Sequence, residues 1–122
     1  MIFQAGIVND WDNRTPLATV TANMTAVIDA LKSINCDVIL MSGPPSKAGI
    51  YASYETQESY VANMKSLAYA ANVPFIDVWA MFGSRWKASA MFDSLHPNQV
   101  GYELIAGYAR TAILNPAVRS TS

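Results

Sequence analysis

Two residues that could take part in catalysis, Asp93 and His96, lie in the segment Asp93-Ser94-Leu95-His96-Pro97. An imidazole can take the proton of a serine hydroxyl and return it to a leaving group, while a carboxylate fixes the tautomer of the ring and stabilises the imidazolium. A spacing of three residues on a tight turn lets one loop present both groups, with Nε2 directed into a cleft. His96 is the single histidine, so any imidazole catalysis must use it. The alternative is an ordinary turn with an exposed histidine beside a capping aspartate.

Asn9 is a second candidate, because Asn9-Asp10 directly follows a predicted buried strand. Its side chain would then stand at the carboxyl edge of the sheet, where open α/β sheets bind ligands. A carboxamide donor placed there could stabilise a tetrahedral oxyanion, an effect of about 10²–10³ in rate. The alternative is that Asn9 and Asp10 only turn the chain after the strand, which both residues favour.

The elements that must position these groups alternate between strands and helices. Short apolar runs predict strands over residues 2–8, 37–41 and 73–78. Apolar residues at spacings of three and four predict a helix that starts at Thr15-Pro16 and runs to about Ile34, a second over residues 55–71, and a third that Asn98 caps and Asn115-Pro116 ends. The predicted inward face of the second helix carries Tyr60, Val61, Met64, Leu67 and Ala68, and that of the third carries Val100, Leu104, Ile105, Tyr108 and Ile113. This order indicates a parallel sheet covered by helices on its faces. We expect one domain over residues 1–116 and a frayed tail over residues 117–122.

Composition narrows the possible functions. The chain has 122 residues, of which 52% are hydrophobic and 14% charged, with a formal net charge of −1. This balance gives no electrostatic case for nucleic acid, and no apolar run approaches the roughly 20 residues that cross a bilayer. One cysteine and one histidine are too few soft ligands for a typical zinc site. We therefore expect no metal, cofactor, nucleic-acid partner or membrane partner. No signal peptide is visible at the start of the chain, and the compartment is left open.

Together, the Asn-Asp pair after one strand and the Asp-x-x-His-Pro element before the last helix resemble the SGNH/GDSL hydrolase family. The segments 40–45, 73–78 and 98–102 are also similar to this family, so the resemblance extends from Ile2 to about Leu114. It implies a three-layer, flavodoxin-like fold and an ester hydrolase that removes O-acetyl or other small acyl groups, with carbohydrate as one class of carrier. It also implies that Asn9 donates to the oxyanion, that Asp93 orients the imidazole and that His96 is the general base.

The chain departs from the family pattern in two respects. Gly6 and Asn9 are separated by two residues, whereas the family usually has Gly-x-Asn-Asp. The family's Gly-Asp-Ser block and second-block glycine precede the Asn-Asp strand and are not found in this sequence. Ser42 is the best internal serine, but Ser42-Gly43-Pro44-Pro45 does not resemble the family's nucleophile turn. The resemblance therefore implies that the serine comes from outside this chain.

In the family's flavodoxin-like sheet, the first strand would pair with the strand over residues 2–8. Without that first strand, residues 2–8 would form an unpaired edge, and proteins usually pair or cover such edges. We therefore expect an upstream polypeptide or a second copy of this chain to pair with residues 2–8. Two alternatives to a hydrolase stay open. One is a non-catalytic SGNH-like structural or carbohydrate-binding module of a larger assembly, such as a phage tail protein. The other is an unrelated α/β binding domain, which would hold the side chains of Asp93 and His96 far apart.

Overall fold

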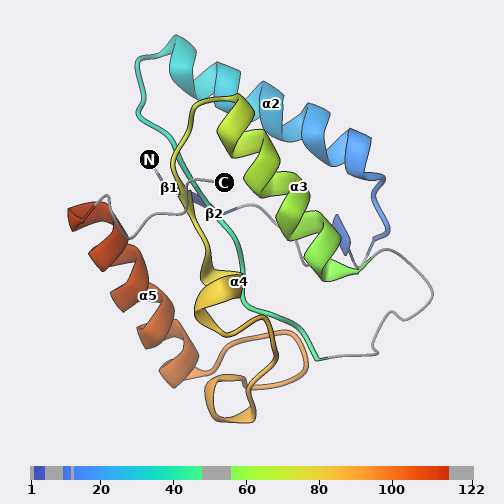
Figure 1. The fold of residues 1–122 in the computed structure, drawn as a ribbon, viewed down its shortest axis with the longest axis vertical. Coiled ribbons are helices and arrows are strands. Elements are labelled where there is room, and N and C mark those ends of the chain that lie inside the picture. The colour runs from blue at the N-terminus through green and yellow to red at the C-terminus, as the bar shows by residue number, and fades with distance from the viewer. Residues whose placement is uncertain (1, 5–9, 12, 48–55, 116–122) are drawn as a thin grey trace.

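The computed structural model describes residues 2–4, 10–11, 13–47 and 56–115 (Figure 1). Three parallel strands form a sheet of order β1-β2-β3, namely β1 (Ile2–Gln4), β2 (Ile39–Met41) and β3 (Phe75–Ile76). The helical elements are α2 (Leu17–Ser33), α3 (Gln57–Ala70), α4 (Val78–Met81), the 3₁₀ turn η1 (Ala88–Ala90) and α5 (Gln99–Leu114). The register pairs Phe3 with Leu40 and Leu40 with Phe75. This arrangement confirms the predicted α/β class with a parallel sheet.

Strands β2 and β3 are covered on both faces, and their successive side chains point to opposite sides of the sheet. Leu40 and Phe75 belong to an apolar cluster with α2 and α3, whereas Met41 and Ile76 belong to a second cluster with α4 and α5. Figure 1 shows α2 and α3 side by side and α5 on the other side of the strands. Three layers therefore enclose two cores, as expected from the alternation of apolar strands and helices.

Helices α2 and α3 end in the same way. Asn35 and Asn72 each follow a helix with a positive φ, 58° and 55° respectively. After α2, the Cys36 amide donates to the Leu31 carbonyl, and after α3 the Val73 amide donates to the Ala68 carbonyl. This bond pattern stops a helix and satisfies its last carbonyls, and asparagine tolerates the left-handed conformation that it requires. Each helix is thereby turned directly into the strand that follows.

The predicted strand over residues 73–78 is shorter in the structure, because its end becomes a helix. Asp77 Oδ1 accepts a hydrogen bond from the Ala80 amide at 2.9 Å and caps α4, which begins at Val78. Side-chain oxygens of aspartate commonly satisfy the free amides at a helix start. The chain then runs through η1 to α5, which lies across the second face of the sheet.

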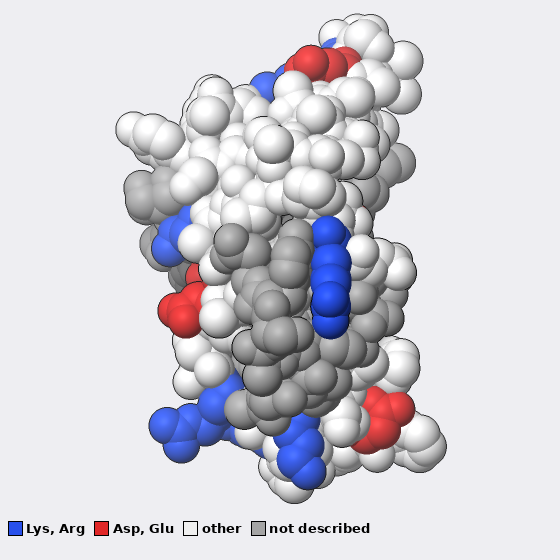
Figure 2. Space-filling view, turned by 90° about the vertical axis from the view of Figure 1, so that its right-hand side faces the viewer, with Lys and Arg blue, Asp and Glu red and all other residues white. Residues whose placement is uncertain are grey.

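The inward faces of the helices follow the predicted apolar spacing only in part. The predicted face of α3 is entirely buried, whereas the predicted face of α5 is not, since Val100 and Leu104 are half exposed and Gly101 and Ala112 are buried instead. On the face in Figure 2, both acidic and basic side chains are spread out rather than gathered by sign. None of the described helices is long and apolar enough to span a membrane.

Candidate active site

Asp93 and His96 are brought together by a short loop between η1 and α5. Asp93 Oδ1 accepts hydrogen bonds from the backbone amides of Leu95 and His96, both at 2.7 Å. The amides of Phe92 and Asp93 in turn donate to the His96 carbonyl, at 2.7 and 3.5 Å. These bonds close a tight turn in which the carboxylate is fixed by the backbone of the residues that follow it.

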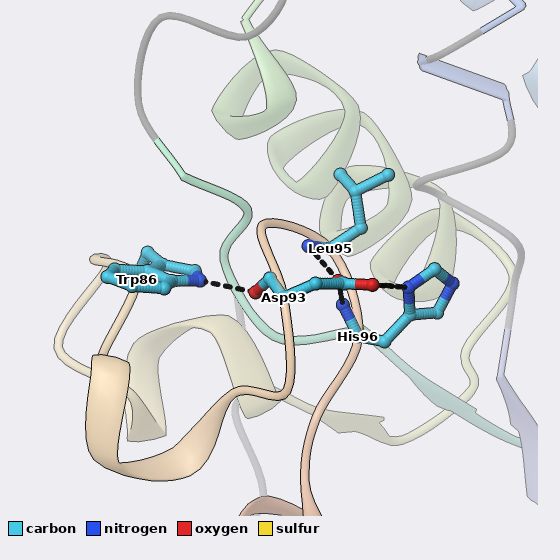
Figure 3. A network of polar contacts seen from close by, with 4 residues as sticks. All are labelled: Trp86, Asp93, Leu95 and His96. Atoms are coloured by element: carbon cyan, nitrogen blue, oxygen red, sulfur yellow. Dashed lines mark hydrogen bonds and ion pairs between the residues drawn. The ribbon is translucent and has the colours of Figure 1, made fainter.

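The carboxylate also contacts the imidazole of His96. His96 Nδ1 lies 2.9 Å from Asp93 Oδ2 and 3.0 Å from Oδ1, and Figure 3 shows the ring with Nδ1 turned toward the carboxylate and the other nitrogen turned away. The acceptor-only carboxylate favours a proton on Nδ1, which leaves Nε2 with a free lone pair. No described residue hydrogen-bonds to Nε2, and the His96 side chain is 66% exposed. The imidazole is therefore oriented to accept a proton at Nε2.

The environment of Asp93 favours its ionised form. The Leu95 amide, the His96 side chain and the His96 amide lower the pKa of Asp93 below its ordinary value, with the Leu95 bond contributing most. Hydrogen bonds to a carboxylate stabilise its charged state. Asp93 is thus ionised at neutral pH and remains an acceptor for the Nδ1 proton.

Asn98 and Gly101 attach this loop to α5. Asn98 Oδ1 accepts from the Gly101 amide at 2.9 Å, and Asn98 Nδ2 donates to the Ser89 carbonyl at 3.1 Å. This confirms the predicted cap of the last helix. Gly101 lies so close to η1 that a β-carbon there would meet the Ala90 carbonyl oxygen at 2.1 Å. A glycine is therefore needed where the helix start passes the backbone that leads into the loop.

Ser42, the best internal serine in the sequence, is enclosed in the core. Its side chain is completely buried, donates to Asp77 Oδ1 at 3.4 Å and accepts from the Trp79 amide at 3.1 Å. Its hydroxyl thus connects the end of β2 to the start of α4. A nucleophile needs an exposed oxygen and a nearby base. Ser42 therefore has a structural role and does not serve as the nucleophile.

Two contacts of the loop were not anticipated from the sequence. Trp86 Nε1 donates to the Asp93 carbonyl at 2.9 Å (Figure 3), and the Lys47 amide donates to the Ser94 carbonyl at 2.9 Å. Lys47 follows the Pro44-Pro45 segment and is far from Ser94 in the sequence, so no local pattern indicates this bond. Trp86 lies in the irregular stretch between α4 and η1, so no local pattern indicates its bond to Asp93 either.

The remaining candidate, Asn9, lies outside the described residues, so its role as oxyanion donor stays a prediction. The described residues contain no group of three or more His, Cys, Asp or Glu side chains that could hold a metal ion. Of the three predicted site residues, the structure therefore brings Asp93 and His96 into contact and does not test the third.

Comparison with known protein families and solved structures identifies the class to which this α/β fold belongs. The model of the GDSL-like lipase/acylhydrolase family matches residues 1–104, and the chain belongs to this family. No curated protein is similar enough in sequence to count as a relative.

Several solved structures have a similar fold. A GDSL-like lipase from Bacteroides thetaiotaomicron superposes with a TM-score of 0.76 at 20% identity, over 93% of this chain and 60% of that one. The acetyl xylan esterase AlAXEase gives 0.73 at 21% identity, over 92% and 65%. A variant of an acetyl-xylooligosaccharide esterase from Geobacillus gives 0.65 at 19% identity, over 88% and 56%. The chain thus spans 56 to 65% of the length of these structures.

Proposed function

We propose that this chain carries the acid–base half of a serine ester hydrolase, with His96 as general base, Asp93 as the carboxylate that orients it and Asn9 as oxyanion donor. The observation that carries the proposal is the pair of contacts, 2.9 and 3.0 Å, between His96 Nδ1 and an Asp93 carboxylate that two backbone amides hold in place. The second ring nitrogen, Nε2, is turned away from the carboxylate and can take a proton from a serine that approaches it.

The chemistry follows from this orientation. A serine oxygen, supplied from outside this chain, attacks the ester carbonyl carbon while its proton passes to His96 Nε2. The Asn9 amide would donate to the oxygen of the tetrahedral intermediate. The proton then passes from Nε2 to the leaving alkoxide, which departs as an alcohol. Water releases the acyl group by the same steps, and the Asp93 carboxylate stabilises the imidazolium each time.

The substrate class proposed for this site is a small acyl ester, in particular an O-acetyl group on a carbohydrate. Two of the structures with a similar fold are described as an acetyl xylan esterase and an acetyl-xylooligosaccharide esterase. Their identity to this chain is only 21% and 19%, so they support the substrate class by analogy of fold. A library of acetylated sugars and longer acyl esters of the same alcohol tests this choice directly.

The same proposal includes a partner for β1. Among the described residues, β1 pairs only with β2, so its other edge can accept a parallel strand. The partner would be an upstream polypeptide that carries the serine, or a second copy of this chain. Because the chain spans 56 to 65% of the similar structures, the upstream polypeptide is the better-supported choice. A monodisperse monomer with rapidly exchanging amides over residues 2–8 would argue against any such partner.

The first experiment is to treat the purified chain with a fluorophosphonate probe and to measure its intact mass. We expect no adduct, because Ser42 is buried and bonded to Asp77. A stoichiometric adduct that maps to a serine of this chain would overturn the requirement for an external nucleophile.

The second experiment joins the serine-bearing N-terminal portion of a solved family structure ahead of Ile2. The chimera should acquire esterase activity and a probe adduct on the grafted serine, and His96→Ala should abolish both. Gln99→Ala, an exposed change near the same helix start, is the matched control and should leave the activity intact. Activity that survives His96→Ala would exclude the proposed base. Glycan binding without hydrolysis would instead favour a non-catalytic module.

A further inference from the structure

The turn that holds Asp93 and His96 is closed almost entirely by bonds within itself. The carboxylate is bound to the amides of Leu95 and His96, and the His96 carbonyl is bound to the amides of Phe92 and Asp93. Such local bonds fix the shape of the turn. They do not fix where the turn, and with it His96 Nε2, points relative to the sheet, so contacts with residues outside the turn must do so.

Two contacts from outside hold consecutive carbonyl groups of the turn. Trp86 Nε1 donates to the carbonyl of Asp93 at 2.9 Å, and the Lys47 amide donates to the carbonyl of Ser94 at 2.9 Å. The two donors are themselves in contact, because Lys47 Nζ lies 5.2 Å from the centroid of the Trp86 ring, within the range of a cation–π interaction. The turn is therefore held between the segment after β2 and the segment after α4.

We propose that Trp86 is a positioning residue for the Asp93–His96 pair, and that Lys47 supports it by lying over the indole ring. In Figure 3 the indole lies on the opposite side of Asp93 from the imidazole. The indole N–H therefore holds the Asp93 backbone, while the Asp93 side chain faces the imidazole of His96. Loss of the indole N–H leaves the turn closed and frees the Asp93 backbone to move. This inference rests on the proposed role of His96 as general base.

Nuclear magnetic resonance tests the proposal on this chain directly, since His96 is the only histidine. A sample labelled with ¹⁵N-histidine gives the signals of one imidazole, which report both its tautomer and the exchange of the Nδ1 proton with water. In Trp86→Phe, which retains an aromatic ring for Lys47, we expect the Nδ1 proton to exchange about 2- to 10-fold faster, the effect of one lost hydrogen bond. Lys47→Met should act in the same direction but less, because the indole N–H remains.

Trp79→Phe is the matched control, because Trp79 is also half-buried but packs against the core on the α2 and α3 side of the sheet. It should leave the exchange of the Nδ1 proton unchanged. The proposal is overturned if the Nδ1 proton of Trp86→Phe exchanges at the wild-type rate, or if Lys47→Met speeds this exchange more than Trp86→Phe does. It is also overturned if Trp79→Phe speeds the exchange as much as Trp86→Phe, because a general loss of stability would then explain both effects.

Kinetics of the active chimera provide an independent measurement. A misplaced base slows the chemical step more than it weakens substrate binding. We therefore expect Trp86→Phe to lower kcat about tenfold with little change in KM. A rise in KM of about tenfold at unchanged kcat would overturn the positioning role. If His96→Ala retained activity, the proposed function would fail, whereas the exchange measurement would still decide whether Trp86 orders the pair.

Discussion

Gly101→Ala and Gly107→Ala provide a matched pair of substitutions within α5, with opposite expected effects on stability. A β-carbon at Gly101 would lie 2.1 Å from the Ala90 carbonyl oxygen and 2.9 Å from Pro97 Cβ, whereas one at Gly107 would meet nothing within 4 Å. Both substitutions gain about 1 kcal/mol of helix propensity. Only Gly101→Ala has to displace a backbone carbonyl to accommodate the new methyl group.

The displacement at Gly101 has two costs that can be estimated. Overpacking costs about 1–3 kcal/mol, and moving the helix start weakens the Asn98 cap at the Gly101 amide, which is worth about 1 kcal/mol. After the propensity gain, Gly101→Ala should lower the free energy of unfolding by about 1–3 kcal/mol. Gly107→Ala should raise it by about 1 kcal/mol.

Urea denaturation followed by far-UV circular dichroism measures both changes on the same chain. The reasoning is refuted if Gly101→Ala is as stable as the wild type or more so, because the close approach of α5 to η1 would then not exist in solution. A Gly107→Ala variant that lost as much stability as Gly101→Ala would also refute it, since both effects would then come from the helix and not from the contact.

Three further predictions concern the loop and its supports. Folding lowers the pKa of Asp93 below 3.8, so its carboxylate stabilises the folded turn above pH 3.8, and this stabilisation is lost as the pH falls through the lower pKa of the folded state. Acid titration should therefore weaken the signal of the His96 Nδ1 proton, and Asp93→Asn should remove this pH dependence. Ser42→Ala leaves the partly buried Trp79 amide without its side-chain acceptor and should lower the free energy of unfolding, measured in urea, by about 1–3 kcal/mol; an unchanged stability would contradict this prediction. Asn98→Ala removes the cap and should lower the melting temperature through a loss of about 1 kcal/mol, which calorimetry can detect.

Local sequence patterns predicted those parts of the fold that depend on neighbouring residues. The helix spacing placed Tyr60 and Met64 on the buried face of α3, and Asn98 was correctly assigned as the cap of α5. The spacing of Asp93 and His96 likewise indicated their contact, because the bonds that close the turn lie within a few residues.

The remaining features depend on contacts between distant parts of the chain. Val100 and Leu104 match the apolar period of α5, yet they are half exposed, because Gly101 is pressed against Ala90 and thereby sets which side of the helix faces the core. The role of Ser42 as a buried link to α4 also could not be foreseen, since it requires Asp77, which follows the next strand and caps α4. Pattern and propensity carry no information about such tertiary pairings.

The repeated ends of α2 and α3 have a consequence for where this fold can change. Both helices pass through a left-handed asparagine into the next strand, so both connections are short and leave little room for added residues. The chain between β3 and α5 is different: it passes through α4 and η1 and crosses to the other face of the sheet. Insertions and deletions are best tolerated in surface segments of this kind. Related domains should therefore differ most in length where the chain changes faces, and so alter the surroundings of the imidazole while the sheet stays the same.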